Sequence, residues 1–405
     1  MRILQLTKKV PYPIKDGEVI GIINLTIGFA GHGHFVHVLS LNTNKHHFNV
    51  AELPAAIAAL GKFEAVDIHT DVTISGALKN LFTNSSYNVE RFYSKAFEQL
   101  IYNTIVNEPF DFILLEGIYL MRYIDAIKAA RKASKHNQHI LIVQRPQNVE
   151  YKIWERLAEQ EQQPLKRFYL SFLAKRMKAF ELKMMNEADV FIPVSQTDLD
   201  IFQSHGCNLY SKAIPTGYVF DTLPPIEYSA ETNTVAFIGG MDWMPNREGV
   251  EWFLDEVWDN VLAVLPDAKF YLAGRNFPDE IKSLKQQGVF IVGEVEDAKQ
   301  FIQSHAVSIV PLFAGSGMRV KIVEAMAWGR AIVSTSIGAE SLAYTHQKDI
   351  LIADTASDFA NAIIAVLQSA ETRKKLGENA QLLIAEKYDN RKISSAIVEF
   401  VNSRP

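Results

Sequence analysis

The sequence predicts two doubly wound α/β domains, each built on a parallel β-sheet. Three observations support this fold class. The chain of 405 residues is long enough for two or three domains. Short runs rich in β-branched residues alternate with helical patterns in two separate regions, as expected for βαβ units. Between these regions, residues 215–233 contain three prolines and no sustained periodicity, which is typical of a linker.

Each region contributes six expected strands. In the first region they are Arg2–Leu6, Val36–Leu41, Ala65–His69, Asp111–Leu115, His139–Val143 and Val190–Val194. In the second region they are Thr234–Ile238, Lys269–Ala273, Val289–Val292, Ala306–Pro311, Ala331–Ser334 and Asp349–Ile352. The helical patterns between them include Ser94–Val106, Tyr119–Lys135, Val250–Leu262 and Ala356–Ser369.

We therefore expect a first domain over residues 1–214, a linker over 215–233 and a second domain over 234–389. The last segment, 390–405, contains a helical pattern over Asn390–Asn402 and is expected to return to the first domain.

Composition excludes several classes of protein. With 48% hydrophobic and 21% charged residues, the chain is neither disordered nor fibrous. Its single cysteine, Cys207, excludes a disulfide framework and a cysteine-based metal cluster. The net charge of -5 argues against general nucleic-acid binding. The sequence shows no signal-peptide pattern and no run of about 20 apolar residues, so we expect a cytoplasmic protein.

Several common site motifs are absent. No G-x-G-x-x-G follows the first strand, and there is no P-loop and no G-x-S-x-G elbow. Asp198-Leu-Asp200 matches the D-x-D pattern that holds a metal in some sugar transferases. It opens a helix, however, where acidic residues complement the helix dipole, so we interpret it as capping. His32, His34 and His37 are not expected to form a metal triad, because His37 lies on a predicted strand. We therefore expect no metal site.

The strongest candidate site lies in residues 315–342. A strand ends there in a glycine-containing loop, a helix starts near Gly317, and Gly329 ends that helix. The free N–H groups at a helix start, together with the dipole, form an anion site. Arg319 and Lys321 place positive charge in this first turn, where the dipole disfavours it. A bound anion would explain that placement, and the alternative is that both are ordinary surface charges. Glu324 can accept hydrogen bonds from a vicinal diol such as a ribose.

Glu116 is the candidate polar residue at a reacting centre. It follows an apolar strand at its carboxyl end, where open α/β sheets place ligands. The alternative interpretation is a solvated strand-end glutamate before the turn at Gly117.

A long helical stretch spans residues 150–187. Between Lys152 and Lys183 it carries eight Lys or Arg and four Glu. We interpret it as a core-facing helix with a solvated basic face. The sharper alternative is a peripheral membrane contact through 152–183, with anionic lipid on the inner face of the cell membrane.

The sequence resembles the retaining glycosyltransferases of family 4, which have the GT-B fold. The resemblance lies in residues 315–342 and in MRILQLTKKVPYPIKDG (1–17), GHGHFVHVLSL (31–41), FIGGMDWMPNREGVEWFLDEVW (237–258), FYLAGR (270–275) and VGEVEDAKQFI (292–302). In addition, RPQNVEYKIWERLAEQ (145–160) is similar to a segment of a subgroup of bacterial envelope-polysaccharide transferases. The resemblance implies two Rossmann-like domains facing across a cleft, with the acceptor on the first and a nucleotide sugar on the second.

The resemblance also implies the site residues. Those that would bind the donor are Gly17, Gly240, Arg275, Val295, Ser316, Gly317, Met318, Arg319, Lys321 and Glu324. Glu324 would bind the ribose, and Arg319 with Lys321 would neutralise the diphosphate. On the acceptor side it implies Gln147, Asn148 and Glu150.

The sequence departs from the family pattern at several of these positions. Ser316 stands where members often have a first Glu, and Gly240 and Pro245 stand where they have Arg and Lys. Glu116 and Gln147 each replace a His.

The expected activity is transfer of a hexose-like unit, with retention, from a UDP- or GDP-sugar to an envelope glycan or lipid-linked acceptor. The nucleotide sugar would be a co-substrate, and no metal or other cofactor is expected. Two alternatives remain open. One is a nucleotide-sugar epimerase of the same fold, and the other is a non-catalytic subunit that binds a sugar nucleotide or a glycan.

Overall fold

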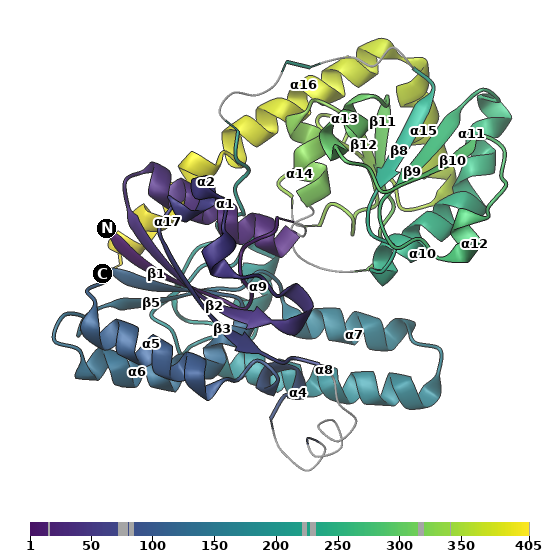
Figure 1. Ribbon diagram of the computed structural model, residues 1–405. Helices are drawn as coiled ribbons and strands as arrows, with labels where there is room; N and C mark the ends of the chain where they lie inside the picture. The colour runs from purple at the N-terminus through teal and green to yellow at the C-terminus, as the bar shows by residue number, and fades with distance from the viewer. Residues whose placement is uncertain are drawn as a thin grey trace. The chain divides into compact units, whose positions relative to one another are not determined.

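The computed structural model describes residues 1–14, 17–71, 80, 85–220, 225–226, 232–314, 320–340 and 342–404. These residues form two compact units (Figure 1). Unit 1 contains the described residues up to Val219 and those from Asn390 onward. Unit 2 contains the described residues between Phe220 and Asp389.

Unit 1 is built on a seven-stranded parallel sheet with the order β3-β2-β1-β4-β5-β6-β7. Its strands are β1 (Arg2–Thr7), β2 (Phe35–Thr43), β3 (Lys62–Ile68), β4 (Phe112–Glu116), β5 (Leu141–Arg145), β6 (Val190–Phe191) and β7 (Tyr210–Ser211). The strand order reverses between β1 and β4. In open α/β sheets, ligands bind at the carboxyl ends of the strands at such a point.

The α-helices of unit 1 lie on both sides of this sheet. They are α1 (Gly17–Gly31), α2 (Ala55–Ala58), α4 (Tyr87–Glu90), α5 (Lys95–Asn107), α6 (Ile124–Ala133), α7 (Glu150–Gln160), α8 (Pro164–Met184), α9 (Gln196–Ser204) and α17 (Asn390–Asn402). Short 3₁₀ helices are η1 (Asn44–His46), η2 (Val50–Glu52) and η3 (Ile118–Tyr123).

Unit 2 is built on a six-stranded parallel sheet with the order β10-β9-β8-β11-β12-β13, which reverses between β8 and β11. The strands are β8 (Thr234–Ile238), β9 (Lys269–Ala273), β10 (Val289–Gly293), β11 (Val307–Val310), β12 (Ala331–Ser334) and β13 (Leu351–Ile352). The helices are α10 (Met244–Trp252), the π-helical turn η4 (Phe253–Val257), α11 (Trp258–Val264), α12 (Asp279–Lys282), α13 (Ala298–Gln303), α14 (Val320–Ala327), α15 (Ala356–Gln368) and α16 (Ala370–Lys387).

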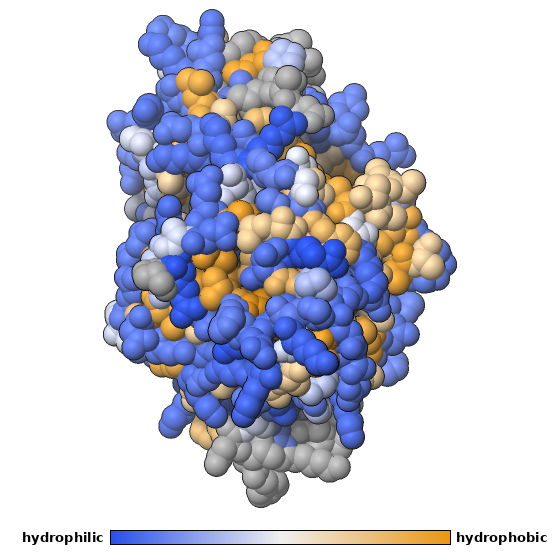
Figure 2. Space-filling model, turned by 90° about the vertical axis from the view of Figure 1, so that its left-hand side faces the viewer, coloured by the Kyte–Doolittle hydropathy of each residue, from blue (hydrophilic) through white to orange (hydrophobic). Residues whose placement is uncertain are grey.

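The central strands are largely apolar on both faces, as expected for a parallel sheet covered by helices. On β4, Ile113 and Leu115 join the core under α5 and α6, whereas Phe112 and Leu114 join the core under α1 and α17. The face of the molecule in Figure 2 shows mainly hydrophilic residues, with smaller hydrophobic patches between them. Apolar area is thus concentrated in the cores, where each buried CH₂ contributes about 0.8 kcal/mol.

The C-terminal helix α17 packs on α1, although the two are more than 350 residues apart (Figure 1). The side-chain amide of Asn390 donates to the carbonyl of Asn24 over 2.6 Å, and Ile393 and Ile397 join the core with Phe29. The Cα of Gly28 lies directly under α17, because a Cβ at this position would be 2.7 Å from the Cβ of Ser394.

The expectation of one long helical stretch over 150–187 is wrong. Two helices, α7 and α8, are separated at 161–163, and Pro164 occupies the first turn of α8. Proline has no N–H and suits a helix start, so the chain breaks before it. Asp198 lies in the first turn of α9, as expected, and the residue that caps this helix is Ser195, whose hydroxyl accepts from the Asp198 N–H.

Substituting Gly28 with Ala tests the contact between α1 and α17. Alanine favours a helix, but its Cβ would overlap Ser394, so we expect Gly28→Ala to lower stability by about 1–3 kcal/mol. Gly31→Ala, on the same helix, is the control because its Cβ would meet nothing within 4 Å. Thermal denaturation should show a lower Tm for the first variant alone. Equal Tm values would contradict the packing.

Candidate functional site

Glu116 lies at the carboxyl end of β4, at the reversal point of the unit 1 sheet, and its side chain is buried. It is 1% exposed, so the alternative of a solvated strand-end glutamate is wrong. Two amides donate to its carboxylate: Nε2 of Gln5 to Oε1 over 3.2 Å, and Nε2 of Gln147 to Oε2 over 2.5 Å. Gln5 in turn accepts from the Thr26 hydroxyl over 2.8 Å, which fixes the orientation of its amide.

Arg145 is the charged partner of Glu116. Its Nε lies 3.9 Å from Oε2 of Glu116, which is too long for a hydrogen bond but close enough for attraction between charges. Its terminal nitrogens donate to the carbonyls of Ile214 and Pro215. Burial raises the pKa of Glu116, while Arg145 and the two amides oppose that shift. The carboxyl group of Glu116 is therefore costly to ionise, but Arg145 and the two amides stabilise its charged form.

The turn after β5 carries the expected acceptor-side residues. Gln147 contacts Glu116, and Asn148 is half-buried next to it. Glu150 begins α7 and accepts a hydrogen bond from the Tyr119 hydroxyl over 3.1 Å. Glu181 of α8 stabilises this turn, because its carboxylate accepts from the backbone N–H groups of Glu150 and Tyr151. Burial raises the pKa of Glu181 to about 8.

In unit 2, the loops that follow β8 and β9 lie side by side. The N–H of Met241 donates to the carbonyl of Arg275 over 2.9 Å. The loops approach so closely that a Cβ on Gly274 would lie 1.9 Å from the carbonyl oxygen of Gly239. Gly240 and Arg275 are therefore neighbours, and the Arg275 side chain also faces Asp242 at 3.8 Å.

Lys321 of α14 reaches this loop through Asn246. Its Nζ donates to Oδ1 of Asn246 over 2.8 Å and lies 4.4 Å from the centre of the Phe237 ring. Nδ2 of Asn246 donates to the carbonyl of Gly240 over 2.8 Å. A chain of contacts thus brings Lys321 and Gly240 to one place, the carboxyl end of β8.

Glu324 lies one helical turn after Lys321. Burial raises the pKa of Glu324 to about 7. None of the residues that the structure describes donates a hydrogen bond to its carboxylate or forms an ion pair with it. It is therefore a partly buried hydrogen-bond acceptor with no partner in the described part of the chain.

The remaining residues expected to bind the nucleotide-sugar donor lie in different parts of the chain. Gly17 is the first residue of α1 in unit 1, and Val295 is half-buried just after β10. Ser316, Gly317, Met318 and Arg319 lie outside the described residues. Within the part of the chain that is described, no three His, Cys, Asp or Glu side chains are grouped to hold a metal ion, and no helix is long and apolar enough to cross a membrane.

Sequence reasoning missed Gln5, Arg145 and Asn246. Arg145 ends a strand next to Glu116 in the sheet register, and a polar residue at the end of an apolar strand was the available signal. Asn246 follows Pro245 in a helix and gave no such signal.

The fold, with candidate residues at the carboxyl ends of β4 and β8, can now be compared with known proteins. Residues 232–369, which lie in unit 2, match the family model described as "Glycosyl transferases group 1". HepE of Anabaena, solved in complex with UDP, is similar in structure with a TM-score of 0.64 and 15% identity over 100% of both chains. TarM of S. aureus has a TM-score of 0.70 and 11% identity over 99% of both chains. The fold is therefore that of the GT-B glycosyltransferases, and the expected fold class is confirmed.

Two curated relatives are similar in sequence. The "Uncharacterized 44.6 kDa protein in cps region" of Klebsiella pneumoniae is 24% identical over 304 residues, which are 72% of this chain and 74% of the relative. The phosphatidyl-myo-inositol mannosyltransferase of Mycolicibacterium smegmatis is 29% identical over 155 residues, 36% of this chain and 39% of the relative.

Replacing Gln147 with Leu tests whether the Gln147 amide stabilises the carboxylate of Glu116. The variant removes one donor from a buried carboxyl, so we expect a loss of about 1–3 kcal/mol in stability. The pKa of Glu116 is higher in the folded protein than in the unfolded chain. The folded state therefore loses stability as the pH rises above the pKa that Glu116 has in the unfolded chain. The loss should therefore grow with pH.

Gln144→Leu, on the same strand, is the matched control for this experiment. No hydrogen bond of its side chain is present among the described residues, and its Oε1 is buried without a partner. Urea denaturation at several pH values compares the two variants. Equal losses, or a loss independent of pH, would contradict the assigned role of Gln147.

Proposed function

We propose that the protein is a retaining, metal-independent glycosyltransferase that moves a sugar from a UDP- or GDP-sugar to an envelope glycan or lipid-linked acceptor. The observation that carries this proposal is the group Lys321, Asn246 and Glu324 inside the segment that matches the glycosyltransferase model. This group combines a cation with a partly buried carboxyl, one turn away, that has no partner among the described residues. These are the groups that a diphosphate and a ribose require.

The donor would bind at the carboxyl end of β8. Lys321, held by Asn246, would offset the charge of the diphosphate, and the resemblance assigns Arg319 the same role. The carboxylate of Glu324 would accept hydrogen bonds from the ribose hydroxyls. Gly240 and Arg275, whose loops lie together, would line the nucleotide, with Val295 near the base. The complexes of HepE with UDP and with UDP-glucose support a uridine nucleotide as the first donor to test.

The transfer would break the bond between the sugar C1 and the diphosphate oxygen and form one between C1 and the acceptor oxygen on the same face. The departing diphosphate would take the proton of the acceptor hydroxyl, so the products would be the glycoside and the free nucleotide. In this scheme the protein supplies no nucleophile. Its task is to orient both substrates and to stabilise the charge that develops.

Glu116 would serve the reacting sugar through its charge. Its carboxyl group is held rigidly by Gln5 and Gln147 in a buried position, where an ionic interaction is stronger than in water. The acceptor would meet unit 1 near Gln147, Asn148 and Glu150. The envelope setting draws support from the relative in the cps region and from the mannosyltransferase relative.

Calorimetric titration with UDP-glucose and GDP-mannose, each with EDTA and with magnesium, tests this function. We expect saturable binding of one of them, unaffected by EDTA, and release of nucleotide when acceptor is added. Binding without any turnover would favour a non-catalytic subunit. Conversion of the sugar with no acceptor present would favour an epimerase. Failure of both to bind would overturn the proposal.

The pH dependence of donor binding gives a sharper result. Only the ionised Glu324 accepts hydrogen bonds with both oxygens, so affinity for UDP-glucose should rise as the pH increases through about 7 and then level off. The diphosphate of UDP-glucose is a diester and does not titrate in this range. Glu324→Gln should bind more weakly, with no such pH dependence, while Glu386→Gln on α16 should behave as wild type. A wild-type affinity that is flat across pH 7 would exclude this role.

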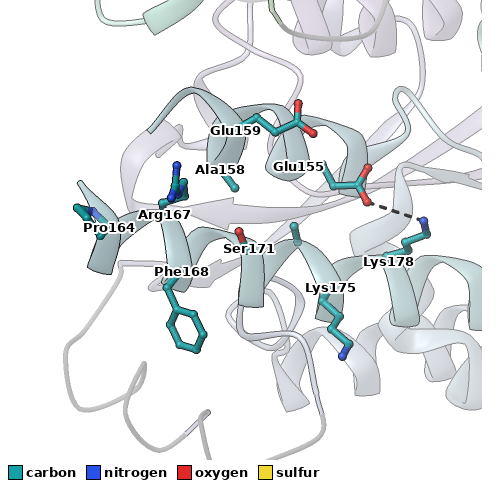
Figure 3. Close-up of a pocket in the computed structure, with 10 residues that line it drawn as sticks. Glu155, Ala158, Glu159, Pro164, Arg167, Phe168, Ser171, Lys175 and Lys178 are labelled. Atoms are coloured by element: carbon teal, nitrogen blue, oxygen red, sulfur yellow. Dashed lines mark ion pairs between the residues drawn. The ribbon is translucent and has the colours of Figure 1, made fainter. Parts of the chain in front are cut away.

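The hairpin of α7 and α8 would contact anionic lipid. Leu165 and Phe168, in the first two turns of α8, are 87% and 74% exposed. Their neighbours Lys166 and Arg167 are basic and exposed, as is Lys175 two turns later. Figure 3 shows the Phe168 ring pointing away from α7, beside a groove of about 780 Å³ between the two helices. Apolar side chains flanked by cations match the interface of an anionic bilayer.

Vesicle sedimentation tests this contact. The protein should bind vesicles that contain phosphatidylglycerol and should not bind pure phosphatidylcholine. The double variant Leu165→Ser, Phe168→Ser should lose at least about tenfold in binding, because each side chain contributes about 1.5–3 kcal/mol when buried. Leu382→Ser, at an exposed leucine of α16, is the control. Unchanged binding of the double variant would contradict the assignment.

A further inference from the structure

Glu181 of α8 is a buried carboxyl group that the proposed function does not use. Its side chain is 0% exposed. Oε1 accepts from the N–H of Glu150 over 3.1 Å, and Oε2 accepts from the N–H of Tyr151 over 3.0 Å. These are the first two N–H groups of α7, which have no partner within their own helix. A side chain about 30 residues further along the chain therefore caps the start of α7.

This cap is costly for a cap. A helix start is usually capped by the side chain of its own N-cap residue, but the N-cap of α7 is Val149, which has no side-chain oxygen. Glu181 takes that role as a buried carboxylate with no cation paired to it among the described residues. Glu150 of α7 and Asp198 of α9 both place negative charge toward it. Such a group contributes little net stability, so its placement points to a role beyond holding α7.

The cap fixes one end of the turn 146–149, which joins β5 to α7. The other end follows Arg145, whose buried guanidinium donates to two backbone carbonyls. Gln147 lies between the two fixed ends, and its amide donates to Oε2 of Glu116 over 2.5 Å. The contact between Gln147 and Glu116 thus depends on both ends of the turn, and Glu181 holds one of them.

The same cap places the Glu150 side chain. The backbone N–H of Glu150 is bound by Glu181, while its carboxylate accepts from the Tyr119 hydroxyl over 3.1 Å. Gln147 and Glu150, two of the residues expected on the acceptor side, therefore belong to one segment that Glu181 holds from α8.

We propose that Glu181 is a positioning residue for sugar transfer: it holds the turn 146–149 and, through Gln147, keeps the carboxylate of Glu116 in the geometry that the reaction needs. The first link, from Glu181 to Gln147 and Glu116, stands on the contacts above. The second link, from Glu116 to the rate of transfer, rests on the proposed function.

Ionisation of Glu181 gives this role a signature. The ionised carboxylate accepts both N–H groups, whereas the protonated form carries a hydrogen on one oxygen. Burial raises the pKa of Glu181 to about 8, against the two N–H groups and with the charges of Glu150 and Asp198. The facing hydroxyls of Tyr119 and Tyr151 stay protonated, because burial raises the pKa of both. As the pH rises toward and through 8, ionisation of Glu181 lowers stability but secures the turn.

Urea unfolding of a double-mutant cycle tests the first link. Glu181→Gln keeps the shape of the side chain and replaces one acceptor oxygen with an NH₂ group. We expect Gln147→Leu to cost at most about half as much free energy of unfolding in Glu181→Gln as in the wild type. Gln5→Leu is the matched control, because Gln5 donates to the same carboxylate from β1, and its cost should not shrink. An undiminished cost of Gln147→Leu would overturn the inference.

Nucleotide release from UDP-glucose or GDP-mannose, with water as the acceptor, tests the second link. Glu181→Gln should lower kcat severalfold and leave the affinity for the donor unchanged, because the donor is assigned to residues of unit 2. The wild-type kcat should rise as the pH increases through about 8, although the Tm falls, and Glu181→Gln should lack this rise. Glu98→Gln, on α5, should behave as wild type. A purely structural role would make kcat and Tm fall together.

The wild-type pH profile keeps the test valid if Glu181→Gln fails to fold, since a kcat that is flat or falls across pH 8 contradicts the positioning role. Coupling between Glu181 and Gln147 in the absence of any donor binding or turnover would instead overturn the proposed function and leave the first link intact.

Discussion

The parallel sheet imposes the constraint on which the rest of the structure depends. Helices cover both faces of each sheet, so the central strands are largely apolar, with a few buried polar residues such as Gln5 and Gln144. Most of the candidate polar side chains lie where the strands end. In unit 1 the carboxyl ends of β1 and β4 meet at the reversal of strand order, and in unit 2 those of β8 and β11 do so. The candidate residues of both units follow from this geometry.

At these strand ends the protein buries charges that need partners. Glu116 has two amides and Arg145, which is itself buried. Such groups are expensive to bury and contribute little net stability, so their presence is better explained by binding than by folding. Glu324 differs, because no described residue satisfies it and its pKa is raised to about 7. Under the proposed function, its partner is the ribose of the donor.

Much of the fold could be predicted because its signals are local. The bounds of β8, β9, β12 and α17 agree with the expected segments, since each combines an apolar run with a clear stop. Pro164 also divides α7 from α8 for a local reason, although the basic and apolar pattern continues across it. Errors of this kind arise when periodicity is weighed above a single breaking residue.

By itself, the sequence determined the alternation of strands and helices, the two parallel sheets and the glycine-bounded helix that ends at Gly329, because these depend on residues close in the chain. It also marked Glu116, Lys321 and Glu324 by their places at a strand end or helix start. Only the tertiary structure decided that Glu116 is buried and not solvated and that Asn246 holds Lys321. Those facts depend on segments tens of residues apart that meet at one sheet edge, and no local pattern encodes which side chains meet there.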